Sequence, residues 1–369
     1  MIPLTRPTLP KSKVVEKKLN DIFKTGMLTN GKYVGEFERQ CAGFLGAKNV
    51  TAVASGTAAI MLSLKCLNLK GEVILPSFNF TSDGHALLWC GLEPVFVDID
   101  RETFNIDPAQ IEKKITKRTS AIMATHVFGN PCRIHEIQKI AQRHNLKVIY
   151  DAAHAFGSEY KNKSVAQFGD ASIFSFTPTK VLTTGEGGVV VLKNNKLAGY
   201  IISGRNNGDN FDREKEFLGL SARMPEFNAI LGIEGLKILA NSTKRRLKLV
   251  DLYKRQLSGV PGIHFQKIDN FSFSVYKDFV ITVDKEKFGI YRDELLKELK
   301  KNNIESKVYF YPPLHKKMVY KKYMSIPLPA TDFVSSRIIS LPLYSHMPEG
   351  YVKKVCSVII NLHERSKSL

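Results

Sequence analysis

The sequence predicts an α/β protein: a larger part with a mainly parallel sheet, followed by a smaller α+β domain. Two observations lead to this prediction. Through the first 240 residues, short β-branched runs alternate with longer amphipathic runs, as in strands joined by crossover helices. From about residue 241 a long basic helical pattern replaces this alternation. We therefore expect a large α/β domain over residues 1–240 and a small C-terminal α+β domain over residues 241–369.

The apolar runs of the first part are expected to form seven strands, at residues 49–54, 72–75, 94–97, 120–125, 147–150, 171–176 and 188–192. Helices are expected at residues 58–67, 82–90, 134–144 and 225–240. In the second part, strands are expected over residues 271–283 and 305–309, around a helix at 291–301. Ligands of parallel sheets bind beyond the carboxyl ends of the strands, so the chemistry of this chain is sought there.

The chain is strongly basic, with 54 Lys and Arg against 35 Asp and Glu and a formal net charge of +19. Residues 241–369 carry 24 of the basic and 12 of the acidic side chains. Such a surplus fits either a nucleic-acid partner or an anionic small ligand. The basic clusters lack interleaved aromatic residues, and no helix-turn-helix is visible outside the fold. We expect no nucleic-acid partner and interpret clusters such as residues 244–248 as solvated helix faces.

Other features exclude further classes of protein. No run approaches the ~18 to 20 apolar residues of a membrane helix, and the first residues lack the pattern of a secretory signal. We therefore expect a cytoplasmic protein without membrane contact. The five cysteines are scattered and expected to be reduced. His126, His135 and His144 have no carboxylate that completes a metal-binding set, so no metal is expected.

The first polar strand end is Ser55-Gly56-Thr57, directly after residues 49–54. Glycine lets a ligand approach the backbone, the two hydroxyls can donate hydrogen bonds, and the free amides of the following helix attract an anion. A phosphate would fit there. The same three residues also make a good helix cap, and the motif alone does not decide between the two interpretations.

Two further strand ends carry a carboxylate and a lysine. Asp151 follows a buried strand and is either a cap or a partner for a protonated ring nitrogen. Lys180 ends the polar turn after residues 171–176, where partial desolvation would lower its pKa and make its amine nucleophilic. With so many basic residues, an exposed loop lysine is the alternative. The glycines at 185–188 do not form a nucleotide loop, because the lysine precedes them.

The fourth strand end contains Phe80, which could stack on a flat ring, whereas Phe78 is expected in the core. A phosphate cradle, a carboxylate for a ring nitrogen, an aromatic face and an amine are together what pyridoxal 5′-phosphate requires. Their joint occurrence at four strand ends is much less expected by chance than any one of them.

With these motifs the chain resembles the sugar aminotransferases of the DegT/DnrJ/EryC1/StrS family, which have the PLP-transferase fold of aspartate aminotransferase. The resemblance covers nearly the whole chain and rests on the motifs at residues 2–4, 35–38, 54–59, 94–100, 151–157, 169–170, 175–176, 180, 185–188, 311–315 and 341–344.

The resemblance implies a role for each matching position. Lys180 would hold the cofactor and shuttle the proton, and Asp151 would face the pyridinium nitrogen. The remaining roles are His154 near the ring hydroxyl, Gly56, Thr57 and Ser175 at the phosphate, Phe80 stacked on the ring, and Tyr311 and His315 at the nucleotide-sugar end of the site.

The implied activity is transfer of an amino group from L-glutamate to a nucleotide-linked keto-deoxysugar, for amino sugars of a surface polysaccharide such as lipopolysaccharide O-antigen. The run at residues 148–154 is similar to the corresponding run in enzymes that aminate C-4 of dTDP-4-keto-6-deoxyglucose. Amination at C-3 of a dTDP-3-keto-6-deoxyhexose is the alternative. A homodimer with the active site at the subunit interface is implied as well. A non-catalytic regulator with this fold is a rival, and a dehydratase relative is disfavoured because Lys180 is retained.

Three departures from the family pattern stand out. Thr177 and Asn207 occupy positions where the family often has histidine, and Ser221 aligns near an asparagine that commonly contacts the phosphate of the neighbouring subunit. These departures concern the expected cross-subunit contacts and substrate choice more than the cofactor.

Overall fold

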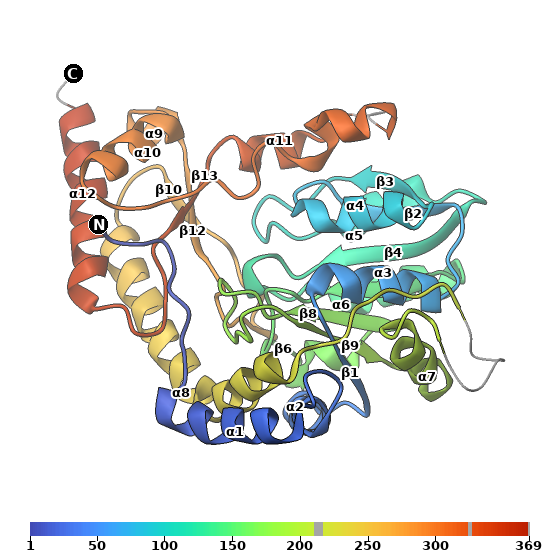
Figure 1. The fold of residues 1–369 in the computed structure, drawn as a ribbon. Helices are drawn as coiled ribbons and strands as arrows, with labels where there is room; N and C mark the ends of the chain where they lie inside the picture. Colours follow the sequence, from blue (N-terminus) through green and yellow to red (C-terminus); the bar gives the residue numbers. More distant parts are fainter. Residues whose placement is uncertain (210–216, 324–326, 368–369) are drawn as a thin grey trace.

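A seven-stranded sheet forms the centre of the larger part in the computed structural model, which describes residues 1–209, 217–323 and 327–367 (Figure 1). The strands lie in the order β1-β9-β8-β5-β4-β2-β3. All neighbours from β8 to β3 are parallel, and β9 is antiparallel to both of its neighbours. The strands are β1 (Asn49–Val53), β2 (Glu72–Pro76), β3 (Glu93–Val97), β4 (Thr119–Thr125), β5 (Lys147–Asp151), β8 (Ala171–Ser175) and β9 (Gly188–Leu192). The predicted mainly parallel sheet is confirmed.

Helices cover both faces of this sheet. The first apolar core contains residues of α1 (Ser12–Thr25), α2 (Lys32–Leu45), α6 (Ile134–Arg143) and the first half of α8 (Glu226–Leu257). The second, on the opposite face, contains residues of α3 (Gly56–Cys66), α4 (Thr81–Trp89) and α7 (Asn195–Gly204). Because side chains of a strand alternate between faces, Ile122 and Ala124 of β4 join the first core and Ala121 and Met123 the second. The short helix α5 (Pro108–Ile111) follows β3.

Helix α8 joins the two parts of the molecule. It begins near the predicted start but continues through the basic residues 244–248 to Leu257. Its first half packs on α1 and α2, and it also packs on α12 (Glu349–Ser366), as Figure 1 shows. The division at residue 240 stays a prediction, since one unbroken helix passes through it.

The smaller part contains an antiparallel sheet with the order β10-β12-β13, formed by β10 (Ile263–Phe265), β12 (Phe279–Val283) and β13 (Ile338–Leu341). Helices α9 (Lys285–Phe288), α10 (Arg292–Lys301) and α11 (Pro329–Ser335) complete it together with α12. The first residues of the chain also belong here, because Ile2 lies in the core of this part and bridges Ile304 (Figure 1).

Two strand predictions for the smaller part need correction. The run at 271–283 is divided into β11 (Ser272–Phe273) and β12, and β11 pairs with β6 (Glu159–Tyr160), which in turn pairs with β7 (Lys163–Ser164). The strand expected at 305–309 is absent from this described stretch, where the chain makes only one bridge, between Lys307 and Ser340. Beyond this bridge the chain turns to place Tyr309 and Phe310 on a cavity, so it cannot continue as a ladder.

One basic side chain also differs from expectation. Arg246 lies in the predicted solvated cluster, yet it is buried and its Nη1 donates to the carbonyl oxygens of Tyr276, Lys277 and Leu343 at 3.3 to 3.4 Å. This guanidinium therefore fastens α8 to the loop before β12. The five cysteines are free thiols. Within the described residues, no helix is both long and apolar enough to cross a membrane.

Candidate active site

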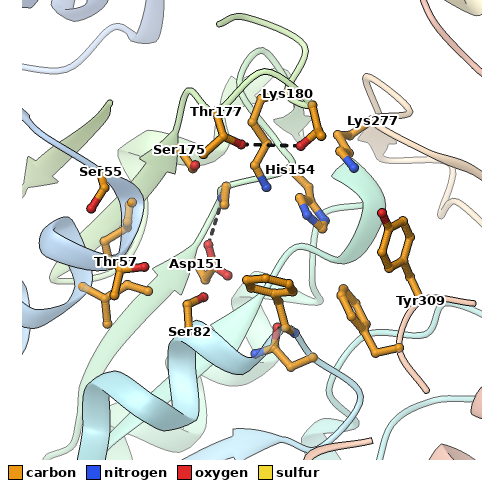
Figure 2. Close-up of a pocket in the computed structure, with 18 of the residues that line it drawn as sticks. Ser55, Thr57, Ser82, Asp151, His154, Ser175, Thr177, Lys180, Lys277 and Tyr309 are labelled. Carbon is orange, nitrogen blue, oxygen red and sulfur yellow. Dashed lines mark hydrogen bonds between the residues drawn. The ribbon is translucent and has the colours of Figure 1, made fainter. Parts of the chain in front are cut away.

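A cavity of about 250 Å³ lies at the carboxyl ends of β1, β5 and β8, where the smaller part meets the larger sheet. Figure 2 shows Ser55, Thr57 and Ser175 on one side of it and Lys277 and Tyr309 on the other. The four strand ends singled out in the sequence all contribute to its lining. Strands β2, β4, β5 and β8 are parallel, and β1 runs in the same direction because β9 is antiparallel to both β1 and β8. Strands that run in one direction present their carboxyl ends at the same edge of the sheet.

Hydroxyls and backbone amides occupy the end of the cavity at α3. Ser55 caps this helix, because its Oγ accepts a hydrogen bond from the amide of Ala58 at 3.1 Å. The hydroxyls of Thr57 and Ser175 line the cavity beside it. A Cβ at Gly56 would lie 2.8 Å from the Cβ of Ser175, so only glycine lets these two strand ends approach so closely. The helix cap and the anion cradle are therefore compatible at this site.

Asp151 is the last residue of β5 and is only 5% exposed. Its Oδ1 accepts the amide hydrogen of Ala153 at 2.9 Å, which fixes the direction of the carboxylate (Figure 2). Burial raises the pKa of Asp151, while the amide of Ala153 and the charge of Lys180 act in the opposite direction. A cation bound next to this carboxylate would strongly favour its ionised form.

Lys180 ends a turn in which its amide donates to the carbonyl of Thr177 at 3.0 Å. Its side chain points into the cavity towards Asp151 and His154 (Figure 2). Burial, and then the charge of Lys277, lower the pKa of Lys180 to about 8. At pH 7 roughly one-tenth of the side chain is therefore the free amine, against about one in several thousand for an ordinary lysine. This is the state that attacks an aldehyde.

His154 stands with its ring nearly parallel to those of Phe128 and Phe310. Its Nδ1 accepts the amide hydrogen of Phe128 at 3.2 Å, which places the ring proton on Nε2. Burial and the nearby cations of Lys180 and Lys277 hold the pKa of His154 well below its usual value. The side chain is a neutral imidazole that can donate from Nε2 to an oxygen of a ligand.

These residues fit pyridoxal 5′-phosphate. The cavity offers donors for a phosphate at α3, a buried carboxylate for a ring nitrogen, a neutral imidazole for a ring hydroxyl and an amine for the aldehyde. Phe80 lines it too, and this phenyl group is 55% exposed. A flat ring bound beside it would cover this apolar surface.

Comparison with known proteins then decides the family. Residues 11–360 match the DegT/DnrJ/EryC1/StrS aminotransferase family. The chain belongs to this family. A dTDP-4-amino-4,6-dideoxy-D-glucose transaminase of Escherichia coli is 36% identical over 366 residues, covering 97% of this chain and 98% of that protein. A dTDP-3-amino-3,6-dideoxy-alpha-D-galactopyranose transaminase of Aneurinibacillus thermoaerophilus is 32% identical over 351 residues, 94% of each chain.

Solved structures agree with this family. The structure of DesI in the presence of its TDP-sugar product gives a TM-score of 0.94 at 31% identity, covering 99% of this chain and 94% of that one. NtdA from Bacillus subtilis with bound cofactor PMP gives 0.88 at 28% identity, with coverages of 96% and 82%. The predicted fold is confirmed, as is the prediction that the chain is an aminotransferase. Aminotransferases of this family use pyridoxal 5′-phosphate, which confirms the cofactor predicted from the strand ends.

Within this family fold, two predicted substrate residues lie outside the main cavity. Tyr311 is exposed, lines a neighbouring groove, and has the guanidinium of Arg292 over its ring at 4.9 Å. His315 is buried: its Nδ1 lies 2.6 Å from the Oγ of Ser77. The Nε2 of His315 lies 3.4 Å from Asp332, so both ring nitrogens have protein partners. The structure brings Tyr311 close to the cavity but directs His315 into the protein.

The positions that depart from the family pattern lie in different surroundings. Thr177 lines the cavity, where its Oγ1 lies 3.4 Å from that of Thr179 (Figure 2). Ser221 is exposed and forms an isolated bridge with Asn206. Asn207 has a positive φ of 67°, and its amide donates to the carbonyl of Leu220. Neither Ser221 nor Asn207 lines the cavity of this chain.

Sequence reasoning missed several residues that line the cavity or support it. Lys277, Asp278, Tyr309 and Phe310 line it from the smaller part, and their positions depend on how that part docks. The one signal for Lys277 was the pair of opposite charges directly before the apolar residues of β12. Asp83 lies behind the residues that line the cavity, in the first turn of α4. Acidic residues are common in the first turn of a helix, so the sequence does not mark Asp83 as part of a site.

Proposed function

We propose that this aminotransferase moves the amino group of L-glutamate to the keto carbon of dTDP-4-keto-6-deoxyglucose, aminating C-4. The observation that carries this proposal is the convergence of Lys180, Asp151 and the hydroxyls at α3 on one cavity. The relative from Escherichia coli supports the sugar, because its name specifies a dTDP-linked 4-amino-4,6-dideoxyglucose. Amination at C-3 is the second candidate, because the name of the relative from Aneurinibacillus thermoaerophilus specifies a 3-amino sugar.

Bound pyridoxal phosphate supplies an aldehyde for the amino group and a ring that delocalises the electron pair left when a neighbouring carbon loses a proton. The amine of Lys180 would attach to that aldehyde and, once displaced by the donor, would move the proton as a general base. A pKa of about 8 keeps Lys180 close to the working pH, which suits it for both steps. Asp151 would hold the ring nitrogen in its protonated form, and His154 would donate to the ring hydroxyl.

The groove beside the cavity suits an anionic acceptor. It is lined by Lys307, Tyr311 and Lys317, and it shares Phe80 and Phe310 with the main cavity. Two cationic side chains and an exposed aromatic ring could bind the diphosphate and base of a nucleotide sugar, with the sugar reaching into the cavity. The orientation of the acceptor follows from this arrangement, since its keto carbon must lie near Lys180.

We also infer a homodimer, as the family resemblance implies, and keep the cytoplasm as its proposed location. Phe23, Met27 and Leu28 are all more than half exposed near the start of α8, and Phe23 packs on Phe227. A second copy of the chain could cover this apolar surface, which soluble monomers seldom leave open. Light scattering of the parent and of a Phe23→Asp variant would test this. We expect the molar mass of two chains for the parent and that of one chain for the variant.

A substitution of Lys180 tests the catalytic part of the proposal. Lys180→Ala should lower the rate of amino transfer at least ~10²-fold, since it removes both the attachment point and the proton carrier. Lys196→Ala removes an exposed lysine from the same part of the chain and should leave the rate unchanged. Near-parental transfer by Lys180→Ala would contradict the assignment.

The substrate is tested separately with a panel of acceptors. Parent enzyme, L-glutamate and dTDP-, UDP- or GDP-linked keto sugars are incubated, and the amino sugar is identified by mass spectrometry and NMR. We expect a 4-amino product from the dTDP-linked 4-keto sugar. A 3-amino product formed only from a 3-keto sugar would replace C-4 by C-3 amination.

A further inference from the structure

A second buried carboxyl group, that of Asp83, lies beneath Asp151. Asp83 belongs to the first turn of α4 and is 0% exposed. Its Oδ2 accepts hydrogen bonds from the side-chain amide of Asn79 at 2.6 Å and from the hydroxyl of Thr125 at 3.2 Å. Thr125 is the register partner of Asp151 between β4 and β5, so its hydrogen bond places the carboxyl group of Asp83 next to that of Asp151. Helix α4 and the ends of β4 and β5 thus meet at a carboxyl pair of which only one member lines the cavity.

Two neighbouring carboxyl groups in a buried site are not both ionised, because their repulsion is not screened by water. Asp151 faces the cavity and lies within the influence of the cation of Lys180, so its negative charge is stabilised. Asp83 lies further from the cavity, and burial together with the charge of Asp151 raises the pKa of Asp83 well above its usual value. A proton shared by the pair is therefore expected on Asp83, which would then donate to Asp151.

We propose that Asp83 is a positioning residue that donates a hydrogen bond to Asp151 as a neutral acid, and so keeps Asp151 ionised and aimed at the cavity. This inference rests on the proposed role of Asp151 at the ring nitrogen of the cofactor. A proton held between Asp151 and a pyridine nitrogen goes to the stronger base. By donating to Asp151, Asp83 weakens the carboxylate as a base, so the proton stays on the nitrogen.

Asn79 extends this network to the ring-facing side of the cavity. Its Nδ2 also lies 2.8 Å from the Oγ1 of Thr125, and its Oδ1 accepts the amide hydrogen of Phe80 at 2.7 Å. The group that holds Asp83 thus also fixes the backbone of the aromatic residue beside the cofactor site. The other groups facing Asp83 are the hydroxyl of Ser82, at 3.4 Å from Oδ1, and the phenol of Tyr320, whose pKa is raised above its usual value mainly by burial and also by Asp83. Neither of these two groups carries a positive charge. The cation of Lys180 also interacts with Asp83, but it interacts more strongly with Asp151, so it favours the ionised form of Asp151 over that of Asp83.

The test measures the ring nitrogen directly. Parent, Asp83→Asn, Asp83→Leu and Asp151→Asn enzymes are loaded with pyridoxal phosphate labelled with ¹⁵N in the ring, and its ¹⁵N chemical shift is recorded against pH. The shift differs widely between protonated and unprotonated nitrogen, and it does not depend on turnover. We expect a protonated nitrogen in the parent and in Asp83→Asn, whose amide can donate to Asp151 in place of the acid. Asp83→Leu should shift the resonance towards the unprotonated value.

The possible outcomes distinguish a failure of the role inferred for Asp83 from a failure of the role proposed for Asp151. An Asp83→Leu shift identical to that of the parent would show that Asp83 only fills space and would overturn this inference. If Asp83 were ionised, Asp83→Asn would lower the titration midpoint of the ring nitrogen by about one unit or more, which would also overturn it. This second comparison does not require the Leu variant to fold. Asp151→Asn with an unchanged, protonated nitrogen would instead refute the proposed role of Asp151 itself.

Discussion

Lys277 shows how one residue can set the protonation of another across a cavity. It is buried in an ion pair with Asp278, with its Nζ 2.9 Å from both carboxylate oxygens, and it contributes to the low pKa of Lys180. Replacing Lys277 by Met removes a positive charge that disfavours the protonated form of Lys180. The pKa of Lys180 should therefore rise above about 8, and covalent uptake of pyridoxal phosphate by the cofactor-free enzyme should require a higher pH.

Two matched variants fix the sign of this effect. Lys277→Arg keeps the charge and should keep the parental midpoint of the pH profile. The charge of Asp278 acts on Lys180 in the opposite direction, so Asp278→Asn should move the midpoint to lower pH. A midpoint that falls in Lys277→Met would contradict the electrostatic explanation. The measurement is the rate of the absorbance change on adding cofactor, from pH 6 to 10.

Residues that follow a strand directly could be predicted, and residues that reach the site through packing could not. Asp151 and Lys180 were recognisable because each follows an apolar run within a few residues. Lys277 is nearly one hundred positions further along the chain than Lys180, and its place depends on contacts such as the hydrogen bond that its backbone amide donates to the carbonyl oxygen of Phe128. Asp83 has a hydrogen-bonding role only because α4 packs against the ends of β4 and β5. Neither relation leaves a local signal in the sequence.

Among the elements, α2 depends on a single carboxylate from α8. The Oε1 of Glu226 accepts the amide hydrogens of Gly31 at 3.0 Å and Val34 at 2.9 Å, and its Oε2 accepts that of Tyr33 at 2.9 Å. A negative charge at a helix N-terminus satisfies free amides and interacts favourably with the helix dipole. Glu226→Ala leaves these buried donors without partners and should lower the free energy of unfolding by about 2 to 4 kcal/mol.

Chemical denaturation followed by circular dichroism measures this change. Glu349→Ala is the matched control, because Glu349 also lies in the first turn of a helix but is exposed. It should change the free energy of unfolding by no more than about 0.5 kcal/mol. Equal effects of the two substitutions would contradict the capping role of Glu226.

Helices and strands with a clear pattern of apolar residues along the sequence were predictable. Strands that form only because they pair with distant residues were not. The run at 188–192 reads as continuous buried strand and is β9 without any shift of its ends. The helix expected at 225–240 and the basic helical pattern expected from residue 241 form one helix, and the charged Arg246 within it is buried against three carbonyl groups. The four residues of β13 are too few to show a period, and they form a strand because they pair with β12.

At the scale of the whole molecule, the smaller part completes the lining of the cavity with residues such as Lys277 and Tyr309, so its attachment to the large sheet matters for the site. One connection is Asp98, directly after β3. It accepts hydrogen bonds from the amide of Ala330 at 2.9 Å and from the amide and hydroxyl of Thr331, both at 2.7 Å. These donors lie at the start of α11, so one carboxylate both caps this helix and fastens it to the larger part.

Asp98→Ala should therefore release α11 from the sheet edge. We expect the free energy of unfolding to fall by about 2 kcal/mol and the amide hydrogens of α11 to exchange with solvent faster. Asp107→Ala is a suitable control, because the side chain of Asp107 caps the short helix α5, where it accepts hydrogen bonds from the amide of Ala109 at 3.0 Å and from the side-chain amide of Gln110 at 3.3 Å. That variant should leave exchange in α11 unchanged. Hydrogen exchange followed by mass spectrometry resolves the two cases, and unaltered exchange at residues 329–335 in Asp98→Ala would show that other contacts hold the two parts together.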